Sequence, residues 1–154
     1  MNVKRINASE YQLVTSLFNK YRIFYKQPPD MALAESFIKE RLENNESVIF
    51  VSLVDDDGRH IPAGFTQLYP VISSARAIKN WVLNDLYVDA DHRKQGIGEA
   101  LIKAAMDFAR AENARYIQLE TANDNYTAQK LYETIGFKKQ EPDNSFFVYR
   151  AQLT

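Results

Sequence analysis

Residues 86–102 of the chain read Leu86-Tyr87-Val88-Asp89-Ala90-Asp91-His92-Arg93-Lys94-Gln95-Gly96-Ile97-Gly98-Glu99-Ala100-Leu101-Ile102. An apolar strand leads into a basic turn with two glycines, and an amphipathic helix follows. At such a helix start, the unpaired backbone N–H groups and the positive end of the helix dipole face the same way. Gly96 and Gly98 carry no Cβ that would keep an anion from those amides. The stretch therefore predicts a local anion site suited to phosphate.

Two other phosphate-binding motifs do not fit these residues. A Walker A loop needs Lys-Ser or Lys-Thr after its last glycine, whereas Gly98 is followed by Glu99-Ala100. A dinucleotide fingerprint starting at Gly96 needs glycine or alanine where Leu101 stands. What remains is Arg-x-x-Gly-x-Gly. A motif this short also occurs by chance at helix starts that bind nothing, and that alternative stays open.

The composition places the chain among ordinary globular proteins. It has 154 residues, 45% of them hydrophobic, and a net charge of -1, so no global field attracts nucleic acid or membranes. It has no cysteine and only two histidines, His60 and His92, which excludes disulfides, thiolate metal sites and a cysteine nucleophile. We expect no metal site.

The order of helical and strand patterns predicts one domain over residues 1–154, with an α/β or α+β fold. Hairpin-like segments flank a strand-helix-strand unit, which indicates a mixed sheet with helices on both faces. The N-terminus shows no apolar signal region, and no long apolar run occurs, so a cytoplasmic location is expected. The predicted strands cover residues 3–6, 48–54, 63–72, 81–88 and 116–121, with a C-terminal hairpin over 137–140 and 146–153. The predicted helices cover residues 13–25, 30–42, 98–112 and 125–135.

A second motif follows the glycine turn: Asn125-Tyr126-Thr127-Ala128-Gln129-Lys130-Leu131-Tyr132-Glu133-Thr134-Ile135-Gly136-Phe137. Taken alone it describes a capped amphipathic helix that ends at a glycine. Together with Arg-x-x-Gly-x-Gly, it resembles the GNAT superfamily of acetyl-CoA-dependent N-acetyltransferases, most strongly over residues 81–140. Residues 83–89 and 21–25 look like the histone and polyamine acetyltransferase subgroup.

The resemblance implies a mixed, mostly antiparallel sheet with a parallel pair of strands at its centre, and acetyl-CoA as acyl donor. Backbone groups of Leu86 and Val88 would pair with the pantetheine arm, and the amides of Arg93 to Gly98 would hold the pyrophosphate. Asn125 and Ala128 would contact the cofactor arm. The implied cofactor-binding residues are Leu86, Tyr87, Val88, Arg93, Lys94, Gln95, Gly96, Ile97, Gly98, Glu99, Asn125 and Ala128. Tyr132 matches the position that donates a proton to the departing thiolate in many members.

Asp85 is the candidate base. It stands inside an otherwise apolar strand, where a carboxylate is costly without a task or a partner. Strict alternation places Leu83, Asp85 and Tyr87 on one face and Asn84 on the other. An alkylammonium of pKa about 10.4 must lose a proton before it attacks a thioester, so Asp85 suits a base or an amine-binding group. A buried aspartate that caps a neighbouring loop is the structural alternative.

The acceptor side is less defined. By resemblance, the loop after the first helix borders the acceptor site, where Tyr21, Phe24, Tyr25 and Asp30 would form an aromatic and acidic lining for a cationic amine. Equally, Phe24 and Tyr25 fit a core at helical spacing, and Asp30 fits a helix N-cap.

The predicted function is direct acetyl transfer from acetyl-CoA to a primary amine of a small polyamine-like or peptidyl acceptor. Acetylation of protein N-termini or lysines is an alternative, as is an acyl-CoA-binding regulator without turnover. No nucleic-acid or membrane partner is expected. The resemblance also suggests a homodimer through the C-terminal strands, for which Phe146-Phe147-Val148-Tyr149 would supply an apolar edge.

Overall fold

The computed structural model describes all 154 residues, which form two compact units, Met1–Glu120 and Thr121–Thr154. The first unit holds one five-stranded sheet and three of the α-helices, and the second holds one α-helix and the C-terminal segment. The single domain over residues 1–154 stays a prediction.

The sheet of the first unit runs in the order β1-β2-β3-β4-β5. Neighbouring strands are antiparallel except β4 and β5, which pair in parallel. This confirms the predicted mixed, mostly antiparallel sheet with one parallel pair. The predicted place of that pair, at the centre of the sheet, is wrong, because β5 is the last strand in the order and the pair lies at the edge. The strands are β1 (Asn2–Arg5), β2 (Val48–Asp56), β3 (Arg59–Ser73), β4 (Ile78–Val88) and β5 (Ile117–Gln118).

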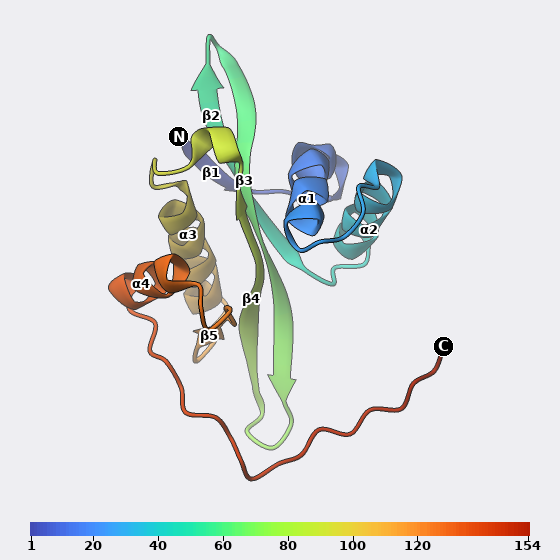
Figure 1. Cartoon of the computed structure of the whole chain (residues 1–154), viewed down its shortest axis with the longest axis vertical. Coiled ribbons are helices and arrows are strands. Elements are labelled where there is room, and N and C mark those ends of the chain that lie inside the picture. The colour runs from blue at the N-terminus through green and yellow to red at the C-terminus, as the bar shows by residue number, and fades with distance from the viewer. The chain divides into compact units, whose positions relative to one another are not determined.

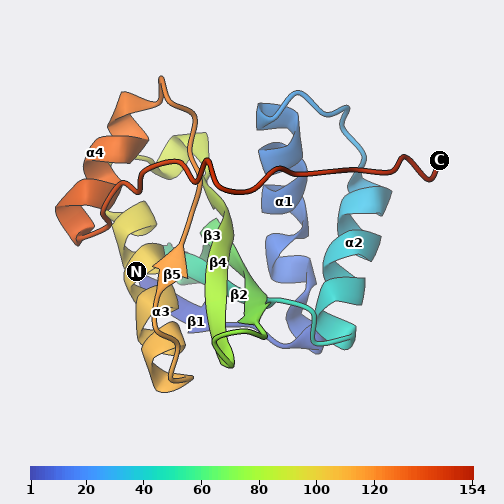
Figure 2. The same ribbon diagram turned by 90° about the horizontal axis from the view of Figure 1, so that it is seen from below.

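Helices cover both faces of this sheet, as predicted. Helices α1 (Gln12–Phe24) and α2 (Met31–Glu43) lie on one face, and α3 (Ile97–Ala111) lies on the other (Figures 1 and 2). Two short 3₁₀ helices, η1 (Ala8–Glu10) and η2 (Ala90–His92), precede α1 and α3. None of the helices combines the length and the apolar run that spanning a membrane requires.

Each face has its own apolar layer. On the α1 side, the ring of Phe18 stacks on Phe37 at 5.4 Å and meets the edge of Phe65 at 6.2 Å. On the α3 side, the ring of Trp81 contacts Phe108 at 4.9 Å. Burial of these large side chains is the main source of stability, at roughly 1.5–3 kcal/mol for each one fully buried. The two layers pack β3 and β4 between the helices.

A β-bulge interrupts the pairing of β3 with β4. Gln67 pairs with Asp85, but the next residue, Leu68, pairs with Leu83, so Asn84 is an extra residue on β4. Paired residues share a face and successive ones alternate, so Leu83 and Asp85 lie on opposite faces. The prediction that they share a face is therefore wrong, because residue counting does not register the bulge.

Ring contacts agree with this assignment of faces. Trp81, two residues before Leu83, packs on α3, whereas Tyr87, two residues after Asp85, packs against the core on the α1 side. Tyr87 also pairs with Phe65, which belongs to that core. Asp85 thus faces α1, on the side where acceptor residues are expected.

The second unit begins at residue 121 and contains α4 (Tyr126–Ile135). The side-chain oxygen of Asn125 accepts a hydrogen bond from the backbone N–H of Ala128 at 3.2 Å, as expected of an N-cap. The helix ends at Gly136, whose φ of 123° belongs to the region that glycine enters without strain. Both helix ends match the prediction.

The predicted C-terminal hairpin is wrong, since residues 137–154 form no strand and are drawn as an extended segment (Figure 1). Four consecutive apolar side chains of this segment, Phe146 to Tyr149, are between 79 and 91% exposed. Their residue types favour a strand, but strand propensity acts only when a neighbouring strand supplies hydrogen bonds and packing. The parallel strand is also shorter than the predicted 116–121.

Candidate active site

The turn between η2 and α3 has the backbone of an anion site. Lys94 and Gly96 have positive φ values of 61° and 79°, whereas Gln95 between them does not. When left-handed and right-handed backbone conformations alternate in this way, successive amide N–H groups can point into one concavity. Gly96 is the N-cap of α3, and no side chain caps the helix. The amides of the first turn of α3 therefore keep their donor capacity for a ligand, next to the positive end of the helix dipole. Phosphate oxygens fit this arrangement.

Arg93 ties this turn to the end of β4. Its Nε donates a hydrogen bond to the carbonyl oxygen of Val88 at 3.1 Å, and its guanidinium lies 5.8 Å from the ring centroid of Tyr87. The backbone N–H of Asp89 donates to the carbonyl oxygen of Ala63 on β3 at 2.8 Å. The structure thus brings Tyr87, Val88 and Arg93 together, and their contacts with a cofactor stay predictions. Glu99, another predicted contact, forms an ion pair with Lys103 at 2.9 Å.

Gly64 is part of this arrangement, although the sequence analysis gave it no role. A Cβ there would stand 2.9 Å from the carbonyl oxygen of Tyr87 and 3.0 Å from Cγ2 of Ile97. Only glycine allows α3 to begin this close to β3 and β4. A glycine within an apolar strand is the signal that could have found it, because such a glycine often marks a close backbone approach.

Asp85 lies in a closed polar cluster and is 2% exposed. Its Oδ2 accepts a hydrogen bond from the side-chain amide of Gln67 at 2.5 Å, and its Oδ1 accepts one from Asn84 at 2.8 Å. The bulge explains the second contact, since neighbours in a regular strand point to opposite faces. Burial raises the pKa of the Asp85 carboxyl, and hydrogen bonds from Asn84, Gln67 and Tyr21 oppose that rise.

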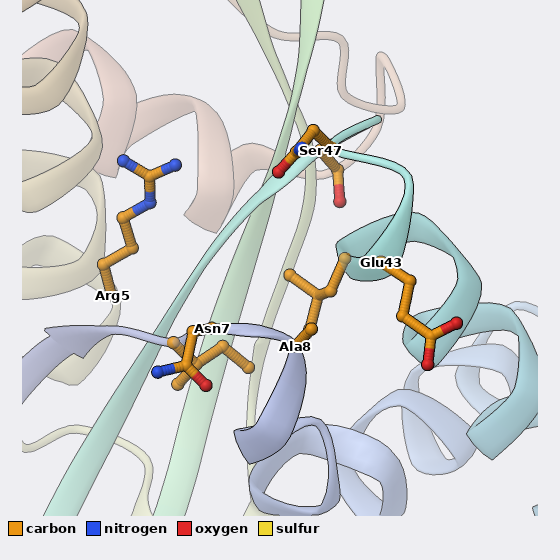
Figure 3. Close-up of a pocket in the computed structure, with 8 residues that line it drawn as sticks. Arg5, Asn7, Ala8, Glu43 and Ser47 are labelled. Atoms are coloured by element: carbon orange, nitrogen blue, oxygen red, sulfur yellow. The ribbon is translucent and has the colours of Figure 1, made fainter.

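Gln67 is itself held by Ser47. The Ser47 hydroxyl donates to Oε1 of Gln67 at 2.7 Å, so the amide nitrogen must face Asp85. Gln67 is fully buried and Ser47 nearly so. Ser47 also lines a cavity of about 410 Å³ together with residues of β1, η1 and α2, among them Arg5, Asn7 and Glu43 (Figure 3). Neither Gln67 nor Ser47 is predicted from the sequence, although a lone glutamine in an apolar strand is the same kind of signal as Asp85.

Two tyrosines face Asp85 from other directions. The Tyr21 hydroxyl of α1 lies 3.5 Å from the carbonyl oxygen of Asn84 and hydrogen-bonds with the Asp85 carboxyl. Burial, followed by the charge of Asp85, raises the pKa of Tyr21 far above its ordinary value. On β3, burial raises the pKa of Tyr69 to about 12, again with Asp85 as the second cause. Both phenols are therefore neutral at physiological pH.

The predicted acceptor residues divide into two groups. Tyr21, Tyr25 and Phe24 form a chain of rings, with centroids 5.0 Å apart between the tyrosines and 5.2 Å apart between Tyr25 and Phe24. Phe24 and Tyr25 are each 60% exposed, so the alternative that they are core residues is wrong. Asp30 instead caps α2, since its carboxylate accepts from the backbone N–H of Leu33 at 3.0 Å. The structure therefore supports the N-cap alternative for Asp30.

An ion pair joins α1 to the strand that carries Asp85. The Lys20 ammonium lies 2.6 Å from Oδ2 of Asp89, immediately after β4. Its hydrogen bond lowers the pKa of Asp89, and the same contact raises the pKa of Lys20. This pair is not predicted from the sequence, because 69 residues separate its members.

Three predicted residues belong to the second unit. Asn125 caps α4 through the N–H of Ala128, and the ring of Tyr132 lies 6.0 Å from that of Phe137. These contacts explain how the local segment folds. The predicted roles of Asn125, Ala128 and Tyr132 toward a cofactor stay predictions.

Comparisons with known proteins agree with one another. The profile of the "Acetyltransferase (GNAT) family" matches residues 11–137. A Bacillus subtilis (strain 168) protein named "Uncharacterized N-acetyltransferase YhfO" is 41% identical over 149 residues, which cover 97% of this chain and 95% of that protein. A Haemophilus influenzae "Probable acetyltransferase" is 30% identical over 88% of each chain. A solved structure described as "Crystal structure of a probable acetyltransferase" has a TM-score of 0.87 and 34% identity over 99% of both chains.

Proposed function

This chain belongs to the acetyltransferase (GNAT) family and is an N-acetyltransferase, and from that premise we propose that its acceptor is a primary amine of a small polyamine-like or peptidyl molecule. The acetyl group passes directly from acetyl-CoA to the amine. No cysteine is present to carry an acyl-enzyme intermediate. Membership of the histone and polyamine acetyltransferase subgroup is part of the same proposal.

One observation carries the choice of a cationic amine: the buried Asp85 carboxylate lies on β4, which leads through η2 into the glycine turn. An alkylammonium has a pKa of about 10.4 and must lose a proton before its nitrogen can attack. Burial makes the Asp85 carboxylate a stronger base than an exposed aspartate, because water no longer stabilises its charge. The exposed rings of Phe24 and Tyr25 add faces that attract a cation.

The proposed contacts with acetyl-CoA are centred on the glycine turn. The backbone amides of Arg93 to Gly98, with the Arg93 and Lys94 side chains, would hold the pyrophosphate of acetyl-CoA. Backbone groups of Leu86 and Val88 would align the pantetheine arm, with Tyr87 beside it and Asn125 and Ala128 as further contacts. When bound, acetyl-CoA supplies a thioester carbonyl already activated by sulfur. Tyr132 is the proposed proton donor to the departing thiolate.

Two alternative functions fit the same architecture. Acetylation of a protein N-terminus or lysine requires the same chemistry with a larger acceptor. A regulator that binds acyl-CoA without turnover requires the glycine turn but no base. The buried Asp85 and its hydrogen-bond donors favour turnover, since keeping an ionisable group in an apolar strand is costly.

The test is release of free CoA thiol from acetyl-CoA in the presence of spermidine, a lysine-containing peptide or a peptide with a free N-terminus. Amine-dependent release with spermidine or the peptides supports the proposal, and the preferred amine identifies the acceptor class. Binding of acetyl-CoA, measured by calorimetry, without thiol release from any of these amines would instead identify a regulator. Acyl-chain preference follows from the same assay with longer acyl-CoA donors.

A homodimer and a cytoplasmic location complete the proposal. The exposed apolar segment Phe146–Tyr149 supports self-association, since a contiguous apolar stretch of this kind is unusual on a monomer surface. Light scattering of the purified protein tests the dimer, and cell fractionation tests the location.

A further inference from the structure

Asp85 is enclosed by the groups that hydrogen-bond with it, so an acceptor amine reaches its carboxylate only through or past one of them. Only 2% of Asp85 is exposed. The three groups are the side chains of Gln67, Asn84 and Tyr21. Gln67 lies on the interior side, fully buried and held by Ser47, whereas Asn84 is exposed and Tyr21 is half-buried.

These three donors differ in what they can do with a proton. A side-chain amide donates through N–H but does not hand that proton on, because its nitrogen is not basic. A hydroxyl is both donor and acceptor, so it accepts one proton while it releases another. Among the three groups, only Tyr21 combines a hydroxyl with a position toward the solvent side.

We propose that the Tyr21 hydroxyl is a catalytic residue that passes a proton from the acceptor ammonium to the Asp85 carboxylate. The inference rests on the proposed function, in which Asp85 acts as the base. It extends that function by giving a buried base a route to its substrate. It also gives Tyr21 a chemical task beyond lining the acceptor site.

The proton transfer balances without any further reactant. An N–H bond of the ammonium breaks as its proton moves to a lone pair of the Tyr21 oxygen. The original O–H bond of Tyr21 breaks at the same time, and that proton forms an O–H bond with Asp85. The freed nitrogen lone pair then forms the bond to the acetyl carbon while the carbon–sulfur bond breaks, and the second proton that this nitrogen loses balances the one that the departing thiolate takes up. Tyr21 ends the step as the neutral phenol it was at the start.

The surroundings of Tyr21 favour this concerted exchange. Its ring packs against Phe18 and Phe65, with centroids 6.0 and 5.9 Å away, and Tyr25 lies at 5.0 Å. These contacts fix the position of the hydroxyl beside Asp85. Burial and the nearby carboxylate raise the pKa of the phenol, so it does not ionise as an intermediate.

Other charged groups near the cluster are already paired or more distant. From β3, Tyr69 faces Asp85 as a neutral phenol. From α2 and the segment before β2, Arg41 and Glu46 act on Tyr69 and pair with each other at 2.8 Å. From α1, Lys20 pairs with Asp89. Tyr69 is the other neutral phenol, but the hydrogen bonds to Asp85 come from Asn84, Gln67 and Tyr21 and not from Tyr69.

The decisive experiment compares two amines of similar size but different basicity. Ethylamine is an ammonium ion at pH 7.5 and needs a base, whereas 2,2,2-trifluoroethylamine is mostly neutral and needs none. For Tyr21→Phe we expect kcat/KM with ethylamine to fall about 10²-fold, and with trifluoroethylamine by less than about threefold. Thiol release from acetyl-CoA measures both. Tyr11→Phe, which removes a hydroxyl that donates to Glu35 instead of Asp85, should leave both values unchanged.

Asn84→Ala distinguishes proton transfer through Tyr21, here called the relay, from direct contact between the amine and Asp85. It removes an amide that the amine would otherwise have to displace to touch Asp85 directly. Direct contact predicts that Asn84→Ala changes the KM for ethylamine and that Tyr21→Phe does not change the ratio of kcat/KM between the two amines. That pair of results would overturn proton transfer through Tyr21 and would show that the amine contacts Asp85 directly. Equal loss of both amines in Tyr21→Phe also overturns the relay, because it indicates a structural role. If the wild type turns over neither ethylamine nor any other amine, the proposed function itself fails.

Discussion

The side-chain amide nitrogen of Gln67 lies 2.5 Å from Oδ2 of Asp85, across two neighbouring strands and out of contact with solvent. The two residues pair directly in the register of β3 with β4. Because Ser47 donates to the other end of the amide, Gln67 is fixed as a donor to Asp85. A donor stabilises the charged carboxylate, so Gln67 controls the pH range over which Asp85 can accept a proton.

Replacement of Gln67 by Met should move the pH dependence of turnover. Loss of the donor disfavours the carboxylate, so the pKa of Asp85 rises further and the acid limb of kcat/KM shifts upward by about one pH unit. Ser47→Ala should cause a smaller shift in the same direction, because it frees the amide without removing it. A pH profile of amine-dependent thiol release measures both. An unchanged acid limb in Gln67→Met would show that the hydrogen bond does not tune the base.

Asp85→Asn should abolish amine turnover and leave acetyl-CoA binding intact. Asparagine keeps the shape of the side chain but cannot accept a proton from an ammonium. We expect kcat/KM to fall by about 10²–10⁴-fold with a basic amine. Calorimetry should give an unchanged Kd for acetyl-CoA, because the glycine turn is not altered. Equal loss of binding and turnover would indicate that Asp85 is structural.

The same substitution should stabilise the protein at neutral pH. The folded-state pKa of Asp85 is raised above its unfolded value, so its contribution to stability is fully present below the unfolded pKa and is lost as the pH rises through the folded pKa. Asparagine does not ionise and avoids that loss, which amounts to about 1.4 kcal/mol for each unit between the two pKa values. In this variant the Gln67 amide would turn over and donate to the Ser47 oxygen, because a hydroxyl accepts as well as donates, and all partners would stay paired.

Urea unfolding at two pH values tests this sign. The gain of Asp85→Asn over the wild type should be present at pH 7.5 and should shrink as the pH approaches the ordinary range of aspartate. A variant that is less stable by the same amount at both pH values would mean that the ionisation of Asp85 does not limit stability.

Gly64→Ala should weaken both the fold and the cofactor site. The new Cβ would stand 2.9 Å from the backbone oxygen of Tyr87 and 3.0 Å from Ile97 at the start of α3, and the backbone oxygen cannot move aside cheaply. Overpacking of this kind costs about 1–3 kcal/mol. The melting temperature should fall by several degrees, and acetyl-CoA should bind more weakly because the first turn of α3 is displaced. An unchanged melting temperature would contradict the tight contact.

The parts of the site that depend on local sequence were predictable. The glycine turn, the N-caps Asp30 and Asn125 and the isolated carboxylate of Asp85 are each visible within a few residues of chain. Gln67, Ser47 and the Lys20–Asp89 pair were not, since each contact joins segments far apart in the sequence. Secondary structure follows the same division. Helices are set by local periodicity and caps, whereas the C-terminal residues with strand propensity form no strand without a partner.

The bulge at Asn84 has a consequence for changes in chain length. Asn84 is the one residue of β4 without a partner of its own on β3 between the Leu68–Leu83 and Gln67–Asp85 pairs. A chain lacking Asn84 would still place Leu83 toward α3 and Asp85 toward α1, because adjacent residues alternate in a regular strand. Deletion of Leu68, by contrast, would shift the register of one strand past the other and turn one set of side chains to the wrong face. The strand thus tolerates a deletion at the position next to its buried carboxylate.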